Sequence, residues 1–162
     1  MKWIFSLAAF AFFFTPLTNA QTNNDDLITS VDAALLQRLI ASVGDDITQT
    51  TEINGAPAVI VKDPDTGLIY QVAGTACNGD RCSGIEMSAR WGATAANSDL
   101  EMLNRLSLTK AAVKVALQTN SDGSESVLVS RYLVLDFGQM YQNLELNVSI
   151  FVAIASGLGE SF

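Results

Sequence analysis

Apolar residues along the chain recur with two periods, one typical of helices and one typical of strands. From Ile28 to Val43 they come every three or four positions, and Gly44 follows directly, in the usual place of a helix C-terminal cap. After Gly44 the period shortens to two, and Asn54-Gly55 is a strong hairpin signal. These patterns predict a helix over 28–43, strands over 46–53, 58–61 and 68–76, and a turn over 63–67.

The same change of period recurs in the second half of the chain. Residues 98–101 have the spacing of a capping box, which predicts a short second helix with Leu100, Leu103 and Leu106 facing inward. A turn over 120–124 separates two alternating stretches, and the second carries apolar residues on both faces, as a central strand does. Strands are therefore predicted over 84–91, 110–118 and 126–135.

The chain ends with a third helical pattern. A third helix is predicted from about Gln139 to Ser156, and its apolar stripe begins at Met140 and continues to Leu158. Residues 150–155 are apolar on all sides, which is typical of a helix buried by its own sheet or by a second copy of the chain. We therefore predict an α+β fold, in which an antiparallel sheet of about five to six strands packs with three helices.

The first twenty residues have the pattern of an export signal. Lys2 supplies a positive start, 3–14 is an almost unbroken apolar run, and small residues end at Ala20. We expect a signal peptide over 1–20, a flexible lead-in over 21–27 and a single domain over 28–162. The run is shorter than the roughly 20 residues of a bilayer span, so no stable span is expected after cleavage, although a retained anchor is the alternative. The expected location is periplasmic or secreted, in a Gram-negative bacterium.

Composition excludes several classes of function. The net charge is −8, and it becomes −9 when Lys2 leaves with the leader, so no nucleic-acid partner is expected. The sequence has no histidine, which excludes the common catalytic triads and catalytic zinc sites, and no phosphate-binding glycine motif occurs. Asp63, Asp65 and Gly67 only partly match a calcium loop. We predict neither an enzyme nor a cofactor nor a metal site.

The two cysteines of the chain form the most specific chemical feature of the mature protein. A two-residue turn at Gly79-Asp80 would place Cys77 opposite Cys82, with their Cα atoms about 4.5–5.5 Å apart, which suits a disulfide. Zinc would need further ligands that the sequence lacks, and a redox pair normally has Cys-x-x-Cys spacing. In an oxidising compartment we predict a structural disulfide that fixes the register of the hairpin.

Several segments then match a known family in order. They are the Cys77 to Cys82 hairpin running into 83–89, Leu103-Asn104-Arg105 in the second helix, the strands joined by Asp122-Gly123, the strand end at 133–136 and the terminal apolar helix. Over 68–162 the sequence resembles the YbjN-domain family, described as proposed regulators of bacterial sensory transduction. It departs from the family pattern at Leu103, where an aromatic is usual, and at Phe137-Gly138, where two glycines are. The resemblance implies a fold similar to the type III secretion chaperones, often assembled as a homodimer.

These observations together predict a non-catalytic binding, chaperone-like or regulatory module that acts through protein–protein contacts in the bacterial envelope. Trp91 is one candidate contact residue, with a place in the core as the alternative. Asn104 and Arg105 are the others, with a buried amide and a solvent-facing cation as their alternatives. A different hypothesis is a small-molecule sensor or an unusual hydrolase that uses carboxylates such as Glu86 or Asp136.

Overall fold

The structure, a computed structural model, describes residues 27–110, 112–160 and 162. The predicted signal peptide over 1–20 and the lead-in up to residue 26 lie outside the described residues. The elements, in chain order, are β1 (Leu27–Ile28), α1 (Ala33–Val43), β2 (Asp46–Ile53), β3 (Ala56–Lys62), β4 (Ile69–Asn78), β5 (Arg81–Gly92), α2 (Leu100–Thr109), β6 (Lys114–Thr119), β7 (Glu125–Val134), β8 (Gln139–Met140) and α3 (Tyr141–Gly159).

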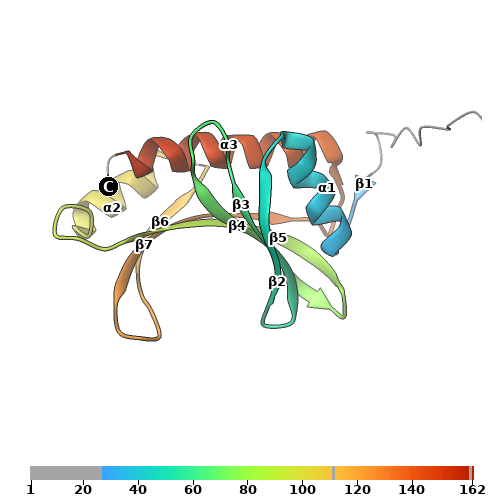
Figure 1. The fold of residues 1–162 in the computed structure, drawn as a ribbon, viewed down its shortest axis with the longest axis horizontal. Coiled ribbons are helices and arrows are strands. Elements are labelled where there is room, and N and C mark those ends of the chain that lie inside the picture. Colours follow the sequence, from blue (N-terminus) through green and yellow to red (C-terminus); the bar gives the residue numbers. More distant parts are fainter. Residues whose placement is uncertain (1–26, 111, 161) are drawn as a thin grey trace, which may run out of the picture.

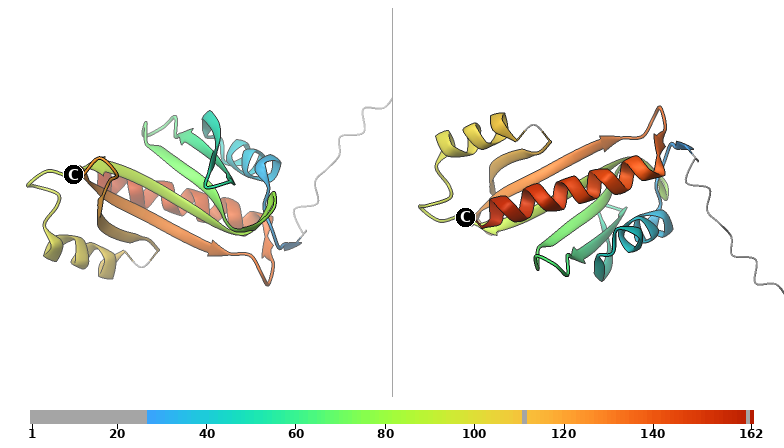
Figure 2. Two further views of the ribbon diagram at one scale, coloured as in Figure 1. Left: turned by 90° about the horizontal axis from the view of Figure 1, so that it is seen from below. Right: turned by 90° about the horizontal axis from the view of Figure 1, so that it is seen from above.

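Six strands form one antiparallel sheet in the order β2-β3-β4-β5-β7-β6, and β1 pairs with β8 in a separate two-stranded ladder. Figure 1 shows this sheet as an arch with the helices on its upper side, while the β2–β3 and β6–β7 turns project to the opposite side. Seen from above, α3 crosses the sheet diagonally, with α1 and α2 to either side of it (Figure 2). The predicted α+β fold, with an antiparallel sheet and three helices, is confirmed.

The hydrophobic core lies between the helices and one face of the sheet. Alternate strand residues such as Val72, Ile85 and Met87 have no exposed surface and join the same apolar cluster as the inner side of α3. Tyr70 and Phe151 meet there with their ring centroids 5.8 Å apart. Complete burial of one such large side chain stabilises the fold by about 1.5–3 kcal/mol. The buried residues of α3 are Leu144, Val148, Phe151, Ala155 and Leu158.

The start of the first helix differs from the prediction. Helix α1 begins at Ala33, because Asp32 caps it by accepting a hydrogen bond from the backbone N–H of Leu35 at 2.8 Å. Ile28, predicted as helical, pairs with Gln139 in the short β1–β8 ladder. Leu27, assigned to the flexible lead-in, belongs to the same ladder. The apolar spacing suggested a longer helix because two-residue strands leave no periodic signal.

The second helix is capped one residue later than predicted. The Asp99 side chain, not that of Ser98, accepts the cap hydrogen bond, from the backbone N–H of Met102 at 2.7 Å. Leu103 is buried as expected, whereas Leu100 is 63% exposed and faces outward, so its inward placement was wrong. Because the helix continues to Thr109, β6 begins at Lys114 rather than at residue 110.

Two further differences concern the end of the chain. Strand β7, predicted as central, is an interior strand that pairs with β5 and β6, although β4 and β5 form the middle of the sheet. Its apolar residues on the second face, Tyr132 and Val134, are 53% and 48% exposed and are not covered by another layer. Met140 belongs to β8, so α3 starts at Tyr141. No helix among the described residues is long and apolar enough to cross a membrane.

Candidate interaction surface

The side of the sheet opposite the helices is not covered by any described element, and we call it the concave face. It is the underside of the arch in Figure 1, between the projecting turns. Ala73, Ser88 and Ser130 are only 5%, 5% and 8% exposed there, because small side chains on a curved sheet are shielded by their longer neighbours. The residues that define the concave face are Gln71, Ala73, Thr75, Gly84, Glu86, Ser88, Ser130 and Tyr132.

Gly84 creates a close approach of side chains on this face. It pairs with Thr75 of β4 on one side and with Val134 of β7 on the other. A Cβ atom at Gly84 would lie 2.4 Å from Thr75 Oγ1 and 2.5 Å from the Tyr132 hydroxyl oxygen. The two hydroxyl groups therefore approach each other over the space that the missing side chain leaves, and a larger residue would displace them.

Glu86 lies two residues further along β5, on the same face. Its cross-strand partners are Ala73 on β4 and Tyr132 on β7. The side chain is half-buried, and within the described residues its carboxylate forms neither a hydrogen bond nor an ion pair. Thr75 Oγ1 is buried and likewise has no hydrogen-bond partner in the described part of the chain. Buried or half-buried polar groups normally have partners, so this pair is conspicuous.

Two open cavities meet at Glu86. The larger, of about 820 Å³, extends across β5 and β7 to β6, and its lining includes Lys114, Ser130 and Tyr132. The smaller, of about 490 Å³, extends towards the β2–β3 turn and includes Thr75. Glu86 is the one acidic residue among the described residues that line either of them. The concave face thus has the shape and the free polar groups of a binding surface.

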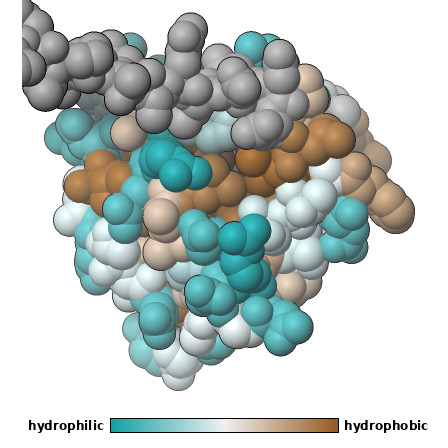
Figure 3. All heavy atoms as spheres, turned by 90° about the vertical axis from the view of Figure 1, so that its right-hand side faces the viewer, coloured by the Kyte–Doolittle hydropathy of each residue, from teal (hydrophilic) through white to brown (hydrophobic). Residues whose placement is uncertain are grey.

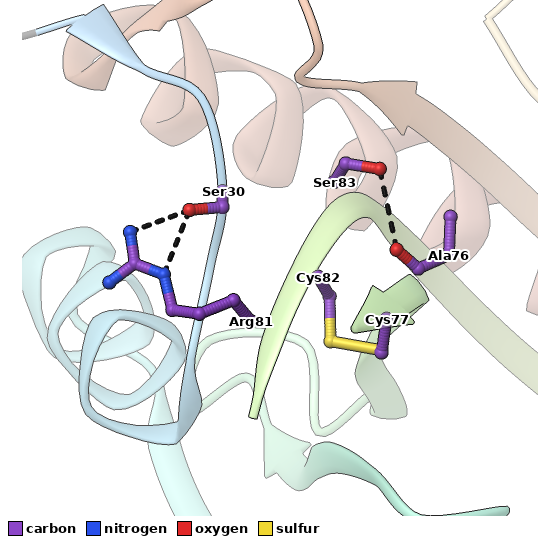
Figure 4. The surroundings of a disulfide bond; sticks show 6 residues. All are labelled: Ser30, Ala76, Cys77, Arg81, Cys82 and Ser83. Atoms are coloured by element: carbon purple, nitrogen blue, oxygen red, sulfur yellow. Dashed lines mark hydrogen bonds between the residues drawn. A yellow bond between two sulfur atoms is a disulfide. The ribbon is translucent and has the colours of Figure 1, made fainter. Parts of the chain in front are cut away.

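The disulfide prediction is confirmed. Cys77 and Cys82 face each other across the β4–β5 hairpin and are bonded, and Asn78 pairs with Arg81 next to the turn (Figure 4). Gly79 has a φ of +65°, whereas Asp80 has a negative φ, as a type II′ turn requires of its two central residues. The two Cα atoms are 3.8 Å apart, closer than the predicted range. No cysteine of the chain is free to act as a metal ligand or nucleophile.

A cluster of carboxylates surrounds a buried tyrosine at the other end of the molecule. The Tyr70 hydroxyl donates a hydrogen bond to Asp45 Oδ2. Burial raises the pKa of Tyr70, and the hydrogen bond and the nearby charge of Asp45 raise it further. Burial also raises the pKa of the Asp45 carboxyl; the hydrogen bond from Tyr70 opposes this rise, and nearby carboxylates such as Asp63 add to it.

Asp63, part of the weak calcium-loop pattern, uses its carboxylate within its own turn. It accepts hydrogen bonds from the backbone N–H groups of Asp65 and Thr66, at 3.2 and 3.1 Å, and from the Thr66 hydroxyl. Burial by itself would raise the pKa of Asp63, but these hydrogen bonds outweigh burial and lower the pKa. Among the described residues, no group of three or more His, Cys, Asp or Glu side chains is placed to hold a metal ion.

Comparison with known proteins identifies the fold. The sequence matches no protein-family model and no curated protein. In three dimensions, the chain superposes on the crystal structure of YbjN from E. coli, described as "a putative transcription regulator", with a TM-score of 0.58 and 16% identity over 81% of this chain and 90% of that chain. The chain has the YbjN fold.

A second solved structure with this fold is an uncharacterized protein from Methanothermobacter thermautotrophicus. Its TM-score is 0.51 at 10% identity, over 77% of this chain and 92% of that chain. The resemblance to the YbjN family found in the sequence is thus supported in the fold. At such low identity the likeness concerns the fold alone, since one fold supports many functions.

The predicted contact residues occupy a different part of the YbjN fold from the concave face. Trp91 is half-buried and packs edge-on against Phe162, with ring centroids 5.4 Å apart, although it also lines a surface cavity of about 380 Å³. Asn104 and Arg105 are exposed on α2, so Asn104 is not the buried amide considered as an alternative. Asp136 is exposed and does not line the cavities at Glu86. The roles of the three contact candidates stay predictions.

Sequence reasoning overlooked the concave face as a surface. The available signal was Gly84, since a glycine inside a strand often marks a close approach of other groups. The exposed apolar area near β1 was also missed: Figure 3 shows hydrophobic residues in a band across this end of the molecule. Leu27 and Phe137, which are 63% and 94% exposed, are at this end, beside the short β1–β8 ladder. Exposed apolar areas of this kind often mark contact surfaces.

Proposed function

We propose that this protein is an exported, non-catalytic binding module that engages a protein partner in the bacterial envelope through its concave face. The observation that carries the proposal is the uncovered sheet face on which Glu86 and Thr75 lack partners within the described residues. A surface that retains unpaired, partly desolvated polar groups gains free energy when a partner supplies the missing hydrogen bonds.

Several features support the export and binding parts of the proposal. The leader pattern and the Cys77–Cys82 disulfide both fit an oxidising compartment. Hydrolysis by a carboxylate pair needs two acids close together, whereas Glu86 is the one acid among the described residues that line its cavities. One solved structure with this fold is described as that of "a putative transcription regulator", a role that is not enzymatic.

The test is affinity capture of the mature domain from periplasm after mild cross-linking, with two variants that each replace a polar amide side chain by tryptophan. Gln71→Trp places a large ring on the concave face at a half-buried polar residue, and Asn104→Trp places the same ring on the exposed side of α2. The wild type and Asn104→Trp are expected to recover one partner in near-equal amount, and Gln71→Trp to lose it.

Two results would contradict the proposal. If Asn104→Trp loses the partner and Gln71→Trp retains it, the binding surface is α2, where the sequence had placed it. If the wild type recovers only itself under conditions in which known periplasmic complexes survive, the protein is not a module for a stable protein partner. Circular dichroism of each variant checks that the fold is retained.

A further inference from the structure

We propose that the concave face recognises an arginine side chain of the partner, held by Glu86, Thr75 and Tyr132 around Gly84. This inference rests on the proposed function and specifies the chemistry of its partner. The geometric basis is the absence of a side chain at Gly84, which leaves the hydroxyl groups of Thr75 and Tyr132 within 2.5 Å of the position that a Cβ would take. We call these four residues the cradle.

The polar groups of the cradle are hydrogen-bond acceptors, so they favour a ligand with several hydrogen-bond donors. The Glu86 carboxylate only accepts hydrogen bonds when ionised, and the hydroxyl oxygens of Thr75 and Tyr132 can also accept. Neither Glu86 nor Thr75 Oγ1 has a partner among the described residues. A cation that donates to the carboxylate forms the stronger, charge-assisted kind of hydrogen bond and removes the cost of leaving that group unpaired.

The shape of the cradle favours a guanidinium group over an ammonium group. Tyr132 lies directly opposite Glu86 on the neighbouring strand, and its ring extends over Gly84, two residues before Glu86 on the same face. The ring is 53% exposed and offers a face on which a planar cation can stack. A guanidinium has five donors in one plane, so it can bond the carboxylate while it stacks, which a compact ammonium cannot do equally well.

The charges around the cradle are compatible with a basic ligand. Lys114 and Arg131 line the same cavity, but Lys114 is exposed on β6 and Arg131 donates its hydrogen bonds to Asn147 and to the Ala112 carbonyl. Neither forms an ion pair with Glu86, so the carboxylate is not neutralised by a described residue. The net charge of −8 attracts cationic partners over longer distances and increases their rate of association.

The test is an NMR titration of the folded domain with the tripeptide Gly-Arg-Gly, at low salt, compared with Gly-citrulline-Gly. Citrulline has nearly the shape of arginine but no charge. With the arginine peptide, the backbone amide signals of Gly84, Glu86 and Tyr132 are expected to shift and to saturate in the millimolar range. The citrulline peptide should bind at least about tenfold more weakly than the arginine peptide. The affinity of a Gly-Lys-Gly peptide should lie between these two.

Two variants and one control complete the experiment. Glu86→Gln retains the shape and removes the charge, so binding of Gly-Arg-Gly should fall about tenfold. Gly84→Ala places a methyl group in the cradle and should abolish binding. Glu101→Gln removes a charge on α2, at the first turn of the helix, and should leave binding unchanged. Equal binding of the citrulline peptide, unchanged binding by Glu86→Gln, or no shifts at the cradle would overturn the inference.

Failure of this inference can be told apart from failure of the proposed function. The peptide titration needs no knowledge of the natural partner. If the wild type and Glu86→Gln capture a partner from periplasm equally well, the arginine cradle is wrong and the binding function stands. If the arginine peptide binds at the cradle but no partner is captured, the protein-binding function is wrong and the cradle stands.

Discussion

Val31 and Cys82 exchange two backbone hydrogen bonds, each with an N···O distance of 2.8 Å. Both polar backbone groups of Cys82 therefore point towards Val31 and away from Cys77. This makes Cys77 and Cys82 a non-hydrogen-bonded pair, the kind that brings Cα atoms closest, about 4.5 Å apart in an ordinary ladder. The 3.8 Å between these two Cα atoms is shorter still. The disulfide holds the hairpin on one side of Cys82, and the segment that leads into α1 is bound on the other.

The side chains next to this junction reinforce it. Arg81 donates two hydrogen bonds to the Ser30 hydroxyl, at 2.9 and 2.6 Å (Figure 4). It also forms an ion pair with Asp32, whose second carboxylate oxygen caps α1. The ion pair is largely solvent-exposed, so its contribution is small. Its position nevertheless links the hairpin to the first turn of the helix.

The first prediction concerns removal of the disulfide. The loop that it closes is short, so Cys77→Ala/Cys82→Ala should lower the free energy of unfolding by about 2 kcal/mol, measured by urea denaturation. Cys82→Ser should lower the free energy of unfolding more than Cys77→Ser does. Both variants break the disulfide, but only Cys82→Ser buries a hydroxyl group, because Cys82 has no exposed surface whereas Cys77 is exposed. Equal losses for the two serine variants would contradict this account.

The second prediction compares two glycines in neighbouring strands. A Cβ at Gly74 would lie 2.5 Å from Cys82 Sγ, which the disulfide and the core hold in place. At Gly84 the obstacles are the hydroxyl oxygens of Thr75 and Tyr132, at 2.4 and 2.5 Å, which lie at the ends of side chains that can rotate away. Gly74→Ala should therefore lower the free energy of unfolding by about 1–3 kcal/mol, and Gly84→Ala should lower it clearly less, as measured by urea denaturation.

A double-mutant cycle checks the cause of this difference. In the Cys77→Ala/Cys82→Ala background the Cys82 sulfur atom is gone, but the Cβ of residue 82 remains 2.9 Å from the Cβ that Gly74→Ala adds. Gly74→Ala should therefore lose part of its cost in free energy of unfolding, while the effect of Gly84→Ala should not change. If the cost of Gly74→Ala is the same in both backgrounds, contact with the Cys82 sulfur is not its cause.

The sequence predicts the parts of this fold that depend on local residues better than the parts that depend on pairing between distant segments. The hairpins at Asn54-Gly55 and Gly79-Asp80 were predicted correctly, because their turn geometry depends on local residues. The β1–β8 ladder was missed because its strands are two residues long and pair across most of the chain. The cap of α2 was misplaced by one residue because Ser98 and Asp99 are both good N-cap residues.

The candidate site shows the same limit. Glu86 was noted in the sequence only as a carboxylate for an alternative hydrolase, and Tyr132 was not noted at all. The two are adjacent because β5 and β7 pair, although helix α2 and strand β6 separate them in the chain. Periodicity predicts that each belongs to a strand, but it does not predict which strands become neighbours.

The third prediction concerns the turn at Asp63. Asp63→Ala removes three hydrogen bonds and should lower the free energy of unfolding at pH 7 by about 1–2 kcal/mol. Because the pKa of Asp63 is lowered in the folded state, its stabilisation is present above the unfolded pKa of about 3.9 and is lost as the pH falls through the folded value. The gap between wild type and variant should therefore close in acid; a constant gap would show that the turn does not depend on the ionised carboxylate.

The fourth prediction concerns Tyr70 and its partner Asp45, whose pKa is shifted in the opposite direction from that of Asp63. The pKa of Asp45 is raised in the folded state, chiefly by burial, so its ionised form opposes folding at neutral pH, and the hydrogen bond from Tyr70 reduces that cost. Tyr70→Phe retains the buried ring but removes this donor. It should lower the free energy of unfolding at pH 7 by about 1–2 kcal/mol and raise the pKa of Asp45 further.

As the pH falls through the folded pKa of Asp45, the carboxyl is protonated in both proteins and the ionised form that needed the donor disappears. The difference in free energy of unfolding between wild type and Tyr70→Phe should then become smaller. Urea denaturation at a series of pH values measures this difference, and carbon-detected NMR titration of Asp45 measures its pKa directly. Asp46→Asn, which removes an exposed charge near Asp45 without touching the hydrogen bond, is the control and should lower the pKa of Asp45. If Tyr70→Phe leaves the pKa of Asp45 unchanged, the hydrogen bond does not stabilise the ionised carboxylate.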